Sequence, residues 1–150
     1  SIQLSLTAAP VPREAVQAAT GILERFTRSA AFADLARAEI LARELPFVRR
    51  LTDGRVMRGA IDVVYRLDGK LVVADYKTDA ISEPAQDLND ASSRRPWSEA
   101  ERAAAIRERA NSYAEQLQSY RDAITEGLGE APQAQVIFLR PGEAVPIYFD

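Results

Sequence analysis

The spacing of apolar residues along the chain predicts helices first and a series of strands after them. Pro12 is of a type favoured at the first position of a helix, and apolar side chains then recur on one helical face. These side chains are Val16, Ala19, Ile22, Leu23 and Phe26. A second, shorter helix is predicted from Ala30 to Arg37. Three extended runs follow, at Ile40 to Leu51, Val56 to Leu67 and Leu71 to Lys77, and they predict an antiparallel meander.

The segment from Ile81 to Trp97 has no clear period and contains prolines and Asn and Ser residues, so we expect a loop. Ser98 and Glu101 fit a capping box, from which one helix is predicted to run to about Gly127. The apolar stripe of this helix consists of Ile106, Ala110, Tyr113, Leu117, Tyr120 and Ile124.

Two more strands are predicted near the end of the sequence, at Gln135 to Leu139 and Val145 to Phe149, separated by Pro141-Gly142. The order of elements indicates an α/β fold, in which helices pack against one sheet. At 150 residues we expect a single domain, with a helical part at 1–38 and the sheet-forming core at 39–150.

An Asp-Gly pair predicts how the second and third strands of the meander are joined. Asp-Gly is favoured in a two-residue type I′ turn, because both central positions of that turn need positive φ. If Asp68-Gly69 forms the turn, counting outward places Leu67 opposite Lys70 and Asp62 opposite Asp75. Two carboxylates would then face each other across one hairpin.

Asp53-Gly54 is a second hairpin signal, between the first and second strands of the meander. A two-residue turn there places Glu44 opposite Val63, on the sheet face away from Asp62. Only a bulge near Pro46 would place Glu44 on the same sheet face as Asp62, so we leave Glu44 out of the candidate site. The proline also predicts that its strand is an edge strand or contains a bulge.

The facing carboxylates are the strongest chemical signal in the sequence. Like charges at opposite positions of a hairpin repel, so a cation is expected between Asp62 and Asp75. Lys77 lies two residues beyond Asp75 and therefore on the same side of its strand. Two carboxylates and a lysine on one face can hold a divalent metal ion and attack a phosphodiester.

Composition narrows the chemistry that is available. The chain has no cysteine, which excludes disulfides, thiolate zinc sites and iron–sulfur clusters, and no histidine, so acid–base or metal chemistry must use other groups. The net charge of −3 counts against a nucleic-acid partner, whereas a cluster of arginines favours contacts with phosphate. This cluster comprises Arg49, Arg50, Arg55 and Arg58, with Arg94 and Arg95 in the later loop. No membrane-spanning run and no phosphate-loop motif of ATPases occurs, and the composition is compatible with the cytoplasm.

Three motifs follow one another in the sequence: Arg58-Gly59-Ala-Ile-Asp62, Asp75-Tyr-Lys-Thr78 and Gln116-Leu-Gln-Ser-Tyr120. This ordered set resembles the RecB-family nucleases of the PD-(D/E)xK superfamily. Glu44-Leu-Pro-Phe47 narrows the resemblance to the C-terminal nuclease domain of AddA-type helicase–nuclease subunits, which process DNA ends. The resemblance covers roughly Glu44 to Leu139. It implies a restriction-endonuclease-like core, with a mixed central sheet flanked by helices.

The resemblance also implies which residues form the active site. Asp62 and Asp75 are expected to bind the metal ion, together with the backbone carbonyl of Tyr76, and Lys77 is expected to be catalytic. The expected ion is Mg²⁺, with Mn²⁺ as an alternative. Such an ion lowers the pKa of a bound water and polarises the phosphoryl oxygen, while a lysine beside it can position that water or assist its deprotonation.

Gln116 and Tyr120 are expected to complete the catalytic site and to support the DNA strand. Residues four apart lie on adjacent turns of one helix face and can reach the same site. Further contacts with DNA are expected from Arg55, Arg58 and Thr78. The implied partners are single-stranded DNA or duplex ends, the helicase domain of the same parent chain, and a second nuclease or helicase subunit. ATP would act only through that helicase motor.

Simpler explanations remain for the same residues. The two aspartates can be solvated carboxylates on an exposed face, and Lys77 can form a salt bridge at the end of a strand. Tyr120 lies on the apolar stripe and can be a core residue, and Gln116 can be a surface residue. The arginine cluster can be a solvated turn.

The missing histidine is a departure from the family pattern. Nucleases of this family usually carry a histidine metal ligand on a helix upstream of the first motif, and this sequence contains none. We expect that the sequence is a fragment of a longer helicase–nuclease. The alternative is an altered site, in a catalytically silent domain of the nuclease fold that binds DNA or a partner subunit.

Overall fold

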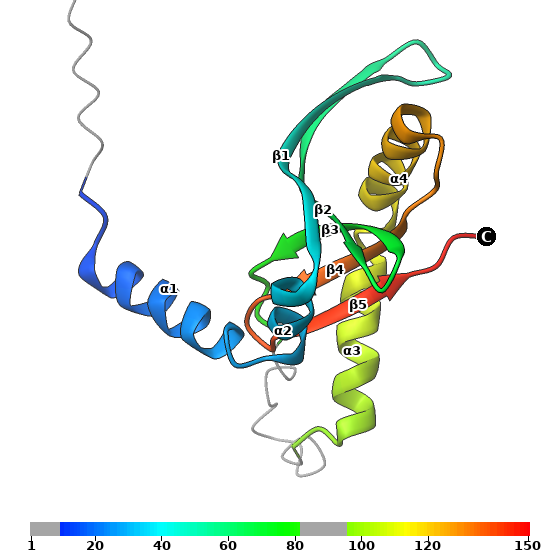
Figure 1. Cartoon of the computed structure of the whole chain (residues 1–150). Coiled ribbons are helices and arrows are strands. Elements are labelled where there is room, and N and C mark those ends of the chain that lie inside the picture. The colour runs from blue at the N-terminus through cyan, green and yellow to red at the C-terminus, as the bar shows by residue number, and fades with distance from the viewer. Residues whose placement is uncertain (1–9, 82–95) are drawn as a thin grey trace, which may run out of the picture.

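The computed structural model describes residues 10–81 and 96–150, which form four helices and five strands in these ranges (Figure 1). The helices are α1 (Arg13–Phe26), α2 (Ala30–Arg37), α3 (Glu99–Asn111) and α4 (Ala114–Leu128). The strands are β1 (Glu39–Arg50), β2 (Val56–Leu67), β3 (Lys70–Lys77), β4 (Gln133–Phe138) and β5 (Glu143–Ile147). The predicted α/β fold is confirmed.

The five strands form one mixed sheet in the order β1-β2-β3-β4-β5. The first three strands are the predicted antiparallel meander. β4 pairs parallel to β3, after a connection that contains α3 and α4, and β5 pairs antiparallel to β4. β1 is an edge strand, as Pro46 predicted, but its register shift lies between Ile40 and Ala42, away from the proline.

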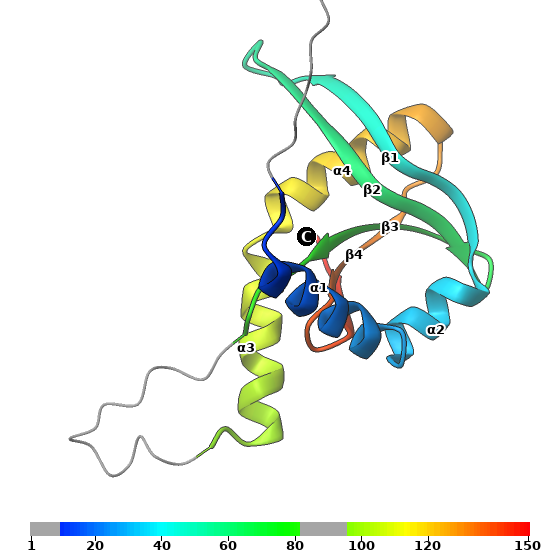
Figure 2. The ribbon, with the colours of Figure 1, turned by 90° about the vertical axis from the view of Figure 1, so that its left-hand side faces the viewer.

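Helices cover both faces of the sheet (Figure 2). α3 and α4 pack on one face, where Val73, Val136, Leu117 and other buried residues form the larger apolar cluster. α2 and the end of α1 cover the other face, where Phe26 and Ala31 pack against Val63 and other buried side chains of the sheet. The rest of α1 extends away from the sheet (Figure 1). Buried apolar surface on both faces is the main contribution that holds the sheet and helices together.

The turn between β2 and β3 has the predicted geometry. Both of its central residues have positive φ, 50° at Asp68 and 78° at Gly69, which is the requirement of a type I′ turn. Leu67 is paired with Lys70 and the ladder continues to Val63 and Ala74. The register that was counted from the sequence is therefore confirmed.

The turn between β1 and β2 differs from the prediction by one residue. The amide of Leu51 donates to the carbonyl of Arg55, so three residues, ending in Gly54, form the loop. Only Gly54, with φ of 84°, adopts the left-handed conformation, whereas Asp53 does not. A type I turn followed by a left-handed glycine gives this three-residue loop.

The longer loop shifts the pairing of β1 with β2 by one residue, so the predicted pairing of Glu44 with Val63 is wrong. Arg43 pairs with Val63 and Leu45 pairs with Ile61, which leaves Glu44 level with Asp62. Glu44 has a positive φ of 48° and its side chain is exposed. A left-handed non-glycine residue is uncommon in a strand, and here it coincides with the level of the candidate site.

The predicted single helix from Ser98 to about Gly127 is two helices. The capping box of Ser98 and Glu101 is present, but α3 ends at Asn111 and α4 begins at Ala114. At the break, the Ser112 hydroxyl donates to the carbonyl of Arg109, and Tyr113 has non-helical ψ of 5°. Hydroxyl groups that bond to nearby backbone compete with the helical ladder, which accounts for a break that the apolar stripe did not predict.

The last two strands begin and end about two residues earlier than predicted. β4 and β5 run from Gln133 to Phe138 and from Glu143 to Ile147, so Tyr148 and Phe149 lie beyond the sheet. The predicted loop from Ile81 to Trp97 falls mostly in 82–95, outside the described residues, and Arg94 and Arg95 lie there too. Within the described ranges, no helix is both long enough and apolar enough to cross a membrane.

Candidate active site

The candidate site lies where β2 and β3 separate. The last backbone pair of this hairpin joins Val63 to Ala74, and the two aspartates occupy the next position on each strand. There the amide of Tyr76 donates to Oδ2 of Asp62, at 2.8 Å, in place of a partner in the ladder. The backbone of β3 therefore orients the carboxylate of β2. β3 itself is held beyond this point by its parallel pairing with β4.

Asp75 is the buried member of the pair, with 3% of its surface exposed. The Lys77 ammonium lies 2.6 Å from its Oδ2 atom. Within residues 10–81 and 96–150, this oxygen has no hydrogen-bond partner besides that ammonium. Strand alternation explains the contact, because Asp75 and Lys77 are two residues apart and point to the same side of β3.

Burial and neighbouring charges shift the pKa values of Asp75 and Lys77. Burial raises the pKa of Asp75 above its ordinary value, and the neighbouring Asp62 carboxylate adds to the rise, while Lys77 opposes it. Partial burial works to lower the pKa of Lys77, but the hydrogen bond and charge of Asp75 outweigh it, so the net shift is upward. Lys77 is therefore a protonated donor at neutral pH. Asp62 and Asp75 lie directly beyond the last backbone pair of the hairpin, so the register agrees with the predicted facing position of the two carboxylates.

α4 completes the cluster with the predicted Gln116 and Tyr120. The Lys77 ammonium donates to Oε1 of Gln116 at 3.3 Å, and Nε2 of Gln116 donates to the Tyr120 hydroxyl at 2.7 Å. Tyr120 is only 5% exposed and its ring packs edge-on against Phe47. Burial and then the charge of Asp75 raise the pKa of the Tyr120 hydroxyl. Tyr120 is thus a core residue, and its hydroxyl also belongs to the hydrogen-bonded group around Lys77.

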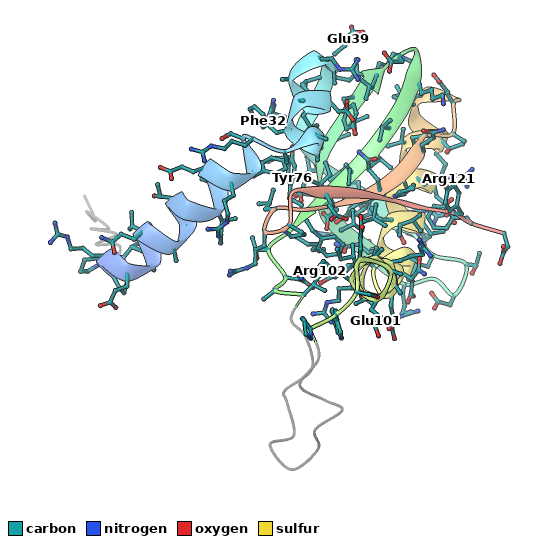
Figure 3. The ribbon with its side chains drawn as sticks, turned by 90° about the horizontal axis from the view of Figure 1, so that it is seen from below. Phe32, Glu39, Tyr76, Glu101, Arg102 and Arg121 are labelled. Carbon is teal, nitrogen blue, oxygen red and sulfur yellow. The ribbon has the colours of Figure 1, made fainter. Side chains whose placement is uncertain are left out.

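The backbone of Tyr76, rather than its side chain, faces the site. Its side chain packs against the cluster around Phe26 on the other face of the sheet (Figure 3). Its amide points toward Asp62, and the N–H and C=O of one residue in an extended strand point to the same side. The carbonyl of Tyr76 therefore lies on the side of Asp62, whereas the next carbonyl, of Lys77, accepts from Leu139 in the other direction.

Three of the residues expected to contact DNA lie outside the carboxylate cluster, whereas Gln116 and Tyr120 belong to it. Thr78 is exposed directly after β3, and its carbonyl accepts a hydrogen bond from Arg140. Arg55 lies at the tip of the β1–β2 hairpin, where its Nε is 2.6 Å from Oδ2 of Asp53. Arg58 lies on β2 with an exposed side chain.

The predicted arginine cluster divides into two groups. Arg49 forms ion pairs with Asp122 of α4 at 2.9 Å and with Glu126 of the same helix at 3.3 Å, so it ties the hairpin to the helix. Arg50 and Arg58 are exposed and form no ion pair with another described residue. The interpretation as a solvated turn is wrong for Arg49, because tertiary contacts fix its guanidinium.

Sequence reasoning missed a group of residues that contacts the site from the side of α3. The Lys77 ammonium lies over the ring of Tyr113, 4.3 Å from its centroid. The Tyr113 hydroxyl donates to Asp79 at 2.7 Å, and Arg109 donates to the same carboxylate oxygen at 2.5 Å. Two signals were available: Asp79 continues the alternation of Asp75 and Lys77, and Tyr113 lies seven residues before Tyr120 on the apolar stripe.

These residues fit a divalent cation. A buried carboxylate oxygen that lacks other partners, beside a second carboxylate, is an arrangement that a cation stabilises. The groups that would hold it are the carboxylates of Asp62 and Asp75 and the carbonyl of Tyr76. Within the described part of the chain, no group of three or more His, Cys, Asp or Glu side chains is placed to hold a metal ion. The protein therefore supplies few ligands, a condition that Mg²⁺ tolerates because it retains several waters.

A mixed sheet flanked by helices, with two aspartates and a lysine where two of its central strands separate, defines a class of domain suited to hydrolysing phosphodiesters. The family model of the PD-(D/E)XK nuclease superfamily matches residues 4–149, and the chain belongs to this superfamily. Asp75-Tyr76-Lys77 supplies the D-x-K element of the family name. Nucleases of this superfamily generally use divalent metal ions, in agreement with the chemistry of the cluster. A comparison with curated proteins gave no match.

Proposed function

We propose that this chain is the exonuclease domain of an ATP-dependent helicase–nuclease of the RecB and AddA type, which acts on DNA ends in double-strand-break repair and recombination. The observation that carries the proposal is the cluster of Asp62, Asp75 and Lys77 where β2 and β3 separate. The three sequence motifs that resemble these nucleases meet at this point. The superfamily match supports nuclease activity, and the resemblance supports the finer assignment.

In this proposal Asp62, Asp75 and the carbonyl of Tyr76 hold Mg²⁺, or Mn²⁺ in its place. When bound, the ion supplies an acidified water and shields the phosphate charge. Lys77, whose pKa is raised, acts as a protonated hydrogen-bond donor to the water or to the phosphoryl oxygens, and not as a base. Gln116 accepts from Lys77 and donates to Tyr120, so it fixes both side chains relative to the carboxylates.

We assign the approach of DNA to the β1–β2 hairpin and the end of β3. Arg58 and Arg50 are exposed cations without a carboxylate partner in the described residues, which suits phosphate contacts. Arg55 can exchange its surface ion pair with Asp53 for a phosphate, because exposed pairs contribute little stability. Thr78 lies next to Lys77 at the end of the strand and completes this set. Binding should therefore weaken as salt increases.

The remaining parts of the proposal concern the setting of the domain. ATP is used by a helicase motor elsewhere in the parent chain, and a second nuclease or helicase subunit is the protein partner. The substrate is single-stranded DNA or the end of a duplex, in the cytoplasm, and no membrane takes part. These assignments rest on the resemblance of the motifs alone.

Cleavage of linear and covalently closed circular DNA in Mg²⁺ or Mn²⁺ tests the proposal. An exonuclease degrades the linear substrate, spares the closed circle, and stops when the ion is chelated. Asp75→Asn should abolish degradation. Asp68→Asn is the matched control, because Asp68 lies in the turn of the same hairpin and asparagine tolerates its positive φ. Equal cleavage of circular DNA would show an endonuclease instead.

A second candidate function is a catalytically silent domain that binds DNA or a partner subunit. The absence of histidine and the small number of acidic ligands in the described residues favour it. In that case the chain binds end-containing DNA without degrading it in either ion, and Asp75→Asn leaves binding unchanged. The same DNA titration, followed by gel analysis of the strands, separates the two functions.

A further inference from the structure

The ammonium of Lys77 is held from three directions. Oδ2 of Asp75 lies 2.6 Å away, Oε1 of Gln116 lies 3.3 Å away, and the ring centroid of Tyr113 lies 4.3 Å away. The side chain is 20% exposed, so water reaches only part of it. Asp75 and Gln116 are hydrogen-bond acceptors that a reaction would also engage. Tyr113 differs from them, because its ring face attracts the cation without using one of the ammonium protons.

Tyr113 is itself fixed by its place at the break between α3 and α4. Its backbone leaves helical geometry there, and its amide donates to the carbonyl of Ala110 at 3.0 Å. Its hydroxyl donates to Asp79 at 2.7 Å, and Arg109 of α3 donates to the same oxygen. The Asp79 side chain is only 13% exposed. The ring is therefore held at both ends, by the helix break and by the carboxylate.

Every second residue from Asp75 to Asp79 takes part in a row of contacts between β3, the segment after it, and the helices α3 and α4. Asp75, Lys77 and Asp79 lie two residues apart and point to one side. Lys77 contacts Gln116 and Tyr113, and Asp79 contacts Tyr113 and Arg109. This succession places an ion pair directly after the candidate site, where Tyr113 connects it to Lys77.

We propose that Tyr113 is a positioning residue for Lys77: its ring face holds the ammonium against Asp75, and the Asp79–Arg109 ion pair fixes the ring. The inference rests on the proposed nuclease function only where activity is measured. The ring adds attraction and also excludes one direction in which the long side chain would otherwise move. Lys77 thus reaches the phosphate from one defined place, while its protons remain free to donate.

The lysine content of the chain allows a direct test of the geometry. The sequence contains only Lys70 and Lys77, and Lys70 is exposed at the start of β3. In protein labelled with ¹³C at the lysine ε-carbon, ring current should shift the ε-CH₂ protons of Lys77 upfield of those of Lys70. Tyr113→Leu should remove the difference, and Tyr113→Phe, which keeps the ring but loses the hydroxyl bond to Asp79, should keep part of it. Resonances of Lys77 that coincide with those of Lys70 in the unmodified protein would overturn the proposal.

Cleavage kinetics test the consequence for the reaction. Tyr113→Leu should lower kcat by about 5- to 30-fold, the range that a partly desolvated cation–π contact corresponds to, with KM for DNA unchanged. Tyr113→Phe should recover part of the rate, because it retains the ring but not the hydroxyl that Asp79 holds. A kcat of Tyr113→Leu equal to that of the unmodified protein, or an equal loss in Tyr113→Phe, overturns the assignment.

Asp79→Asn provides a variant that leaves the ring itself in place. It removes the charge that fixes the Tyr113 hydroxyl, so the ε-CH₂ shift of Lys77 should decrease toward that of Lys70 and kcat should fall less than in Tyr113→Leu. An unchanged shift removes the ion pair from the proposal. If the unmodified protein cleaves no DNA, the proposed nuclease function is wrong. The ε-CH₂ shifts of Lys77 still test whether Tyr113 positions this side chain.

Discussion

Gly59 offers a sharp test of how the β1–β2 hairpin supports the site. It pairs with Phe47 across the hairpin, and the Phe47 ring lies over it. A Cβ atom added at Gly59 would lie 2.8 Å from Cε1 and 3.3 Å from Cζ of that ring. The same ring packs edge-on against Tyr120, with centroids 5.3 Å apart. Gly59→Ala should therefore displace Phe47 and disturb the position of Tyr120.

The size of the effect follows from these distances. Carbon atoms pack at about 3.5–4.0 Å, so the ring must retreat by roughly 0.7 Å or more from the new methyl group. Overpacking of this kind costs about 1–3 kcal/mol, and the reduced freedom of the unfolded chain returns about 0.4–1 kcal/mol. A net loss of about 1–2 kcal/mol is expected for Gly59→Ala. For a chain of this length that corresponds to a decrease of roughly 2–8 °C in Tm.

Thermal and urea unfolding followed by circular dichroism measure this loss. Gly127→Ala is the matched control, because a methyl group at this position of α4 meets no atom within 4 Å. Alanine there should stabilise the protein by about 0.5–1 kcal/mol, as expected for glycine replaced inside a helix. In a Phe47→Leu background the ring is gone, and Gly59→Ala should then cost little. An equal loss in both backgrounds, or no loss in either, would refute the steric explanation.

Three further predictions concern the charged groups of the site. Lys77→Ala should abolish cleavage while the Kd for DNA stays nearly the same, because the lost donor acts in the transition state; cleavage at the unmodified rate in gel assays would remove it from the mechanism. Asp75→Asn should make the metal-free protein more stable in urea at neutral pH, because the raised pKa of Asp75 means that its charged form destabilises the fold. That advantage should shrink as the pH falls toward about 3, where the carboxyl is protonated in folded and unfolded protein alike, and an advantage independent of pH would contradict it. Calorimetric titration with Mn²⁺ should show weak binding that Asp62→Asn removes, since two carboxylates and one carbonyl are few ligands; tight binding, or binding that persists in the variant, would mean that other groups hold the ion.

Short-range backbone preferences determined much of this protein from its sequence alone. Asp68-Gly69 requires positive φ at two successive residues, and this requirement selects a type I′ turn and the register of β2 with β3. The approach of Asp62 to Asp75 follows from that register by counting. The contact of Lys77 with Asp75 follows from strand alternation, and the proximity of Gln116 and Tyr120 follows from helical spacing.

The tertiary structure decided the loop length and the helix boundary at places where the local sequence is compatible with more than one conformation. Asp53-Gly54 is compatible with a two-residue or a three-residue loop, and the packing of Phe47 and Arg49 against α4 accompanies the longer one. The stripe that suggested one helix did not predict the break at Tyr113, which brings the ring over Lys77.

Long-range contacts of this kind depend on surfaces brought together from distant parts of the chain. Arg49 and Asp122, for example, are 73 residues apart in the sequence, and only the folded hairpin brings their charges to 2.9 Å. Local spacing fixes the side of an element on which a residue lies, because φ and ψ repeat along a strand or helix. Local spacing does not fix which residue of another element that side chain contacts. The packing of the helices on the two faces of the sheet sets the distance and angle between elements. The candidate site residues could therefore be named from the sequence. The group around Tyr113 that holds Lys77 depends on tertiary packing and could not.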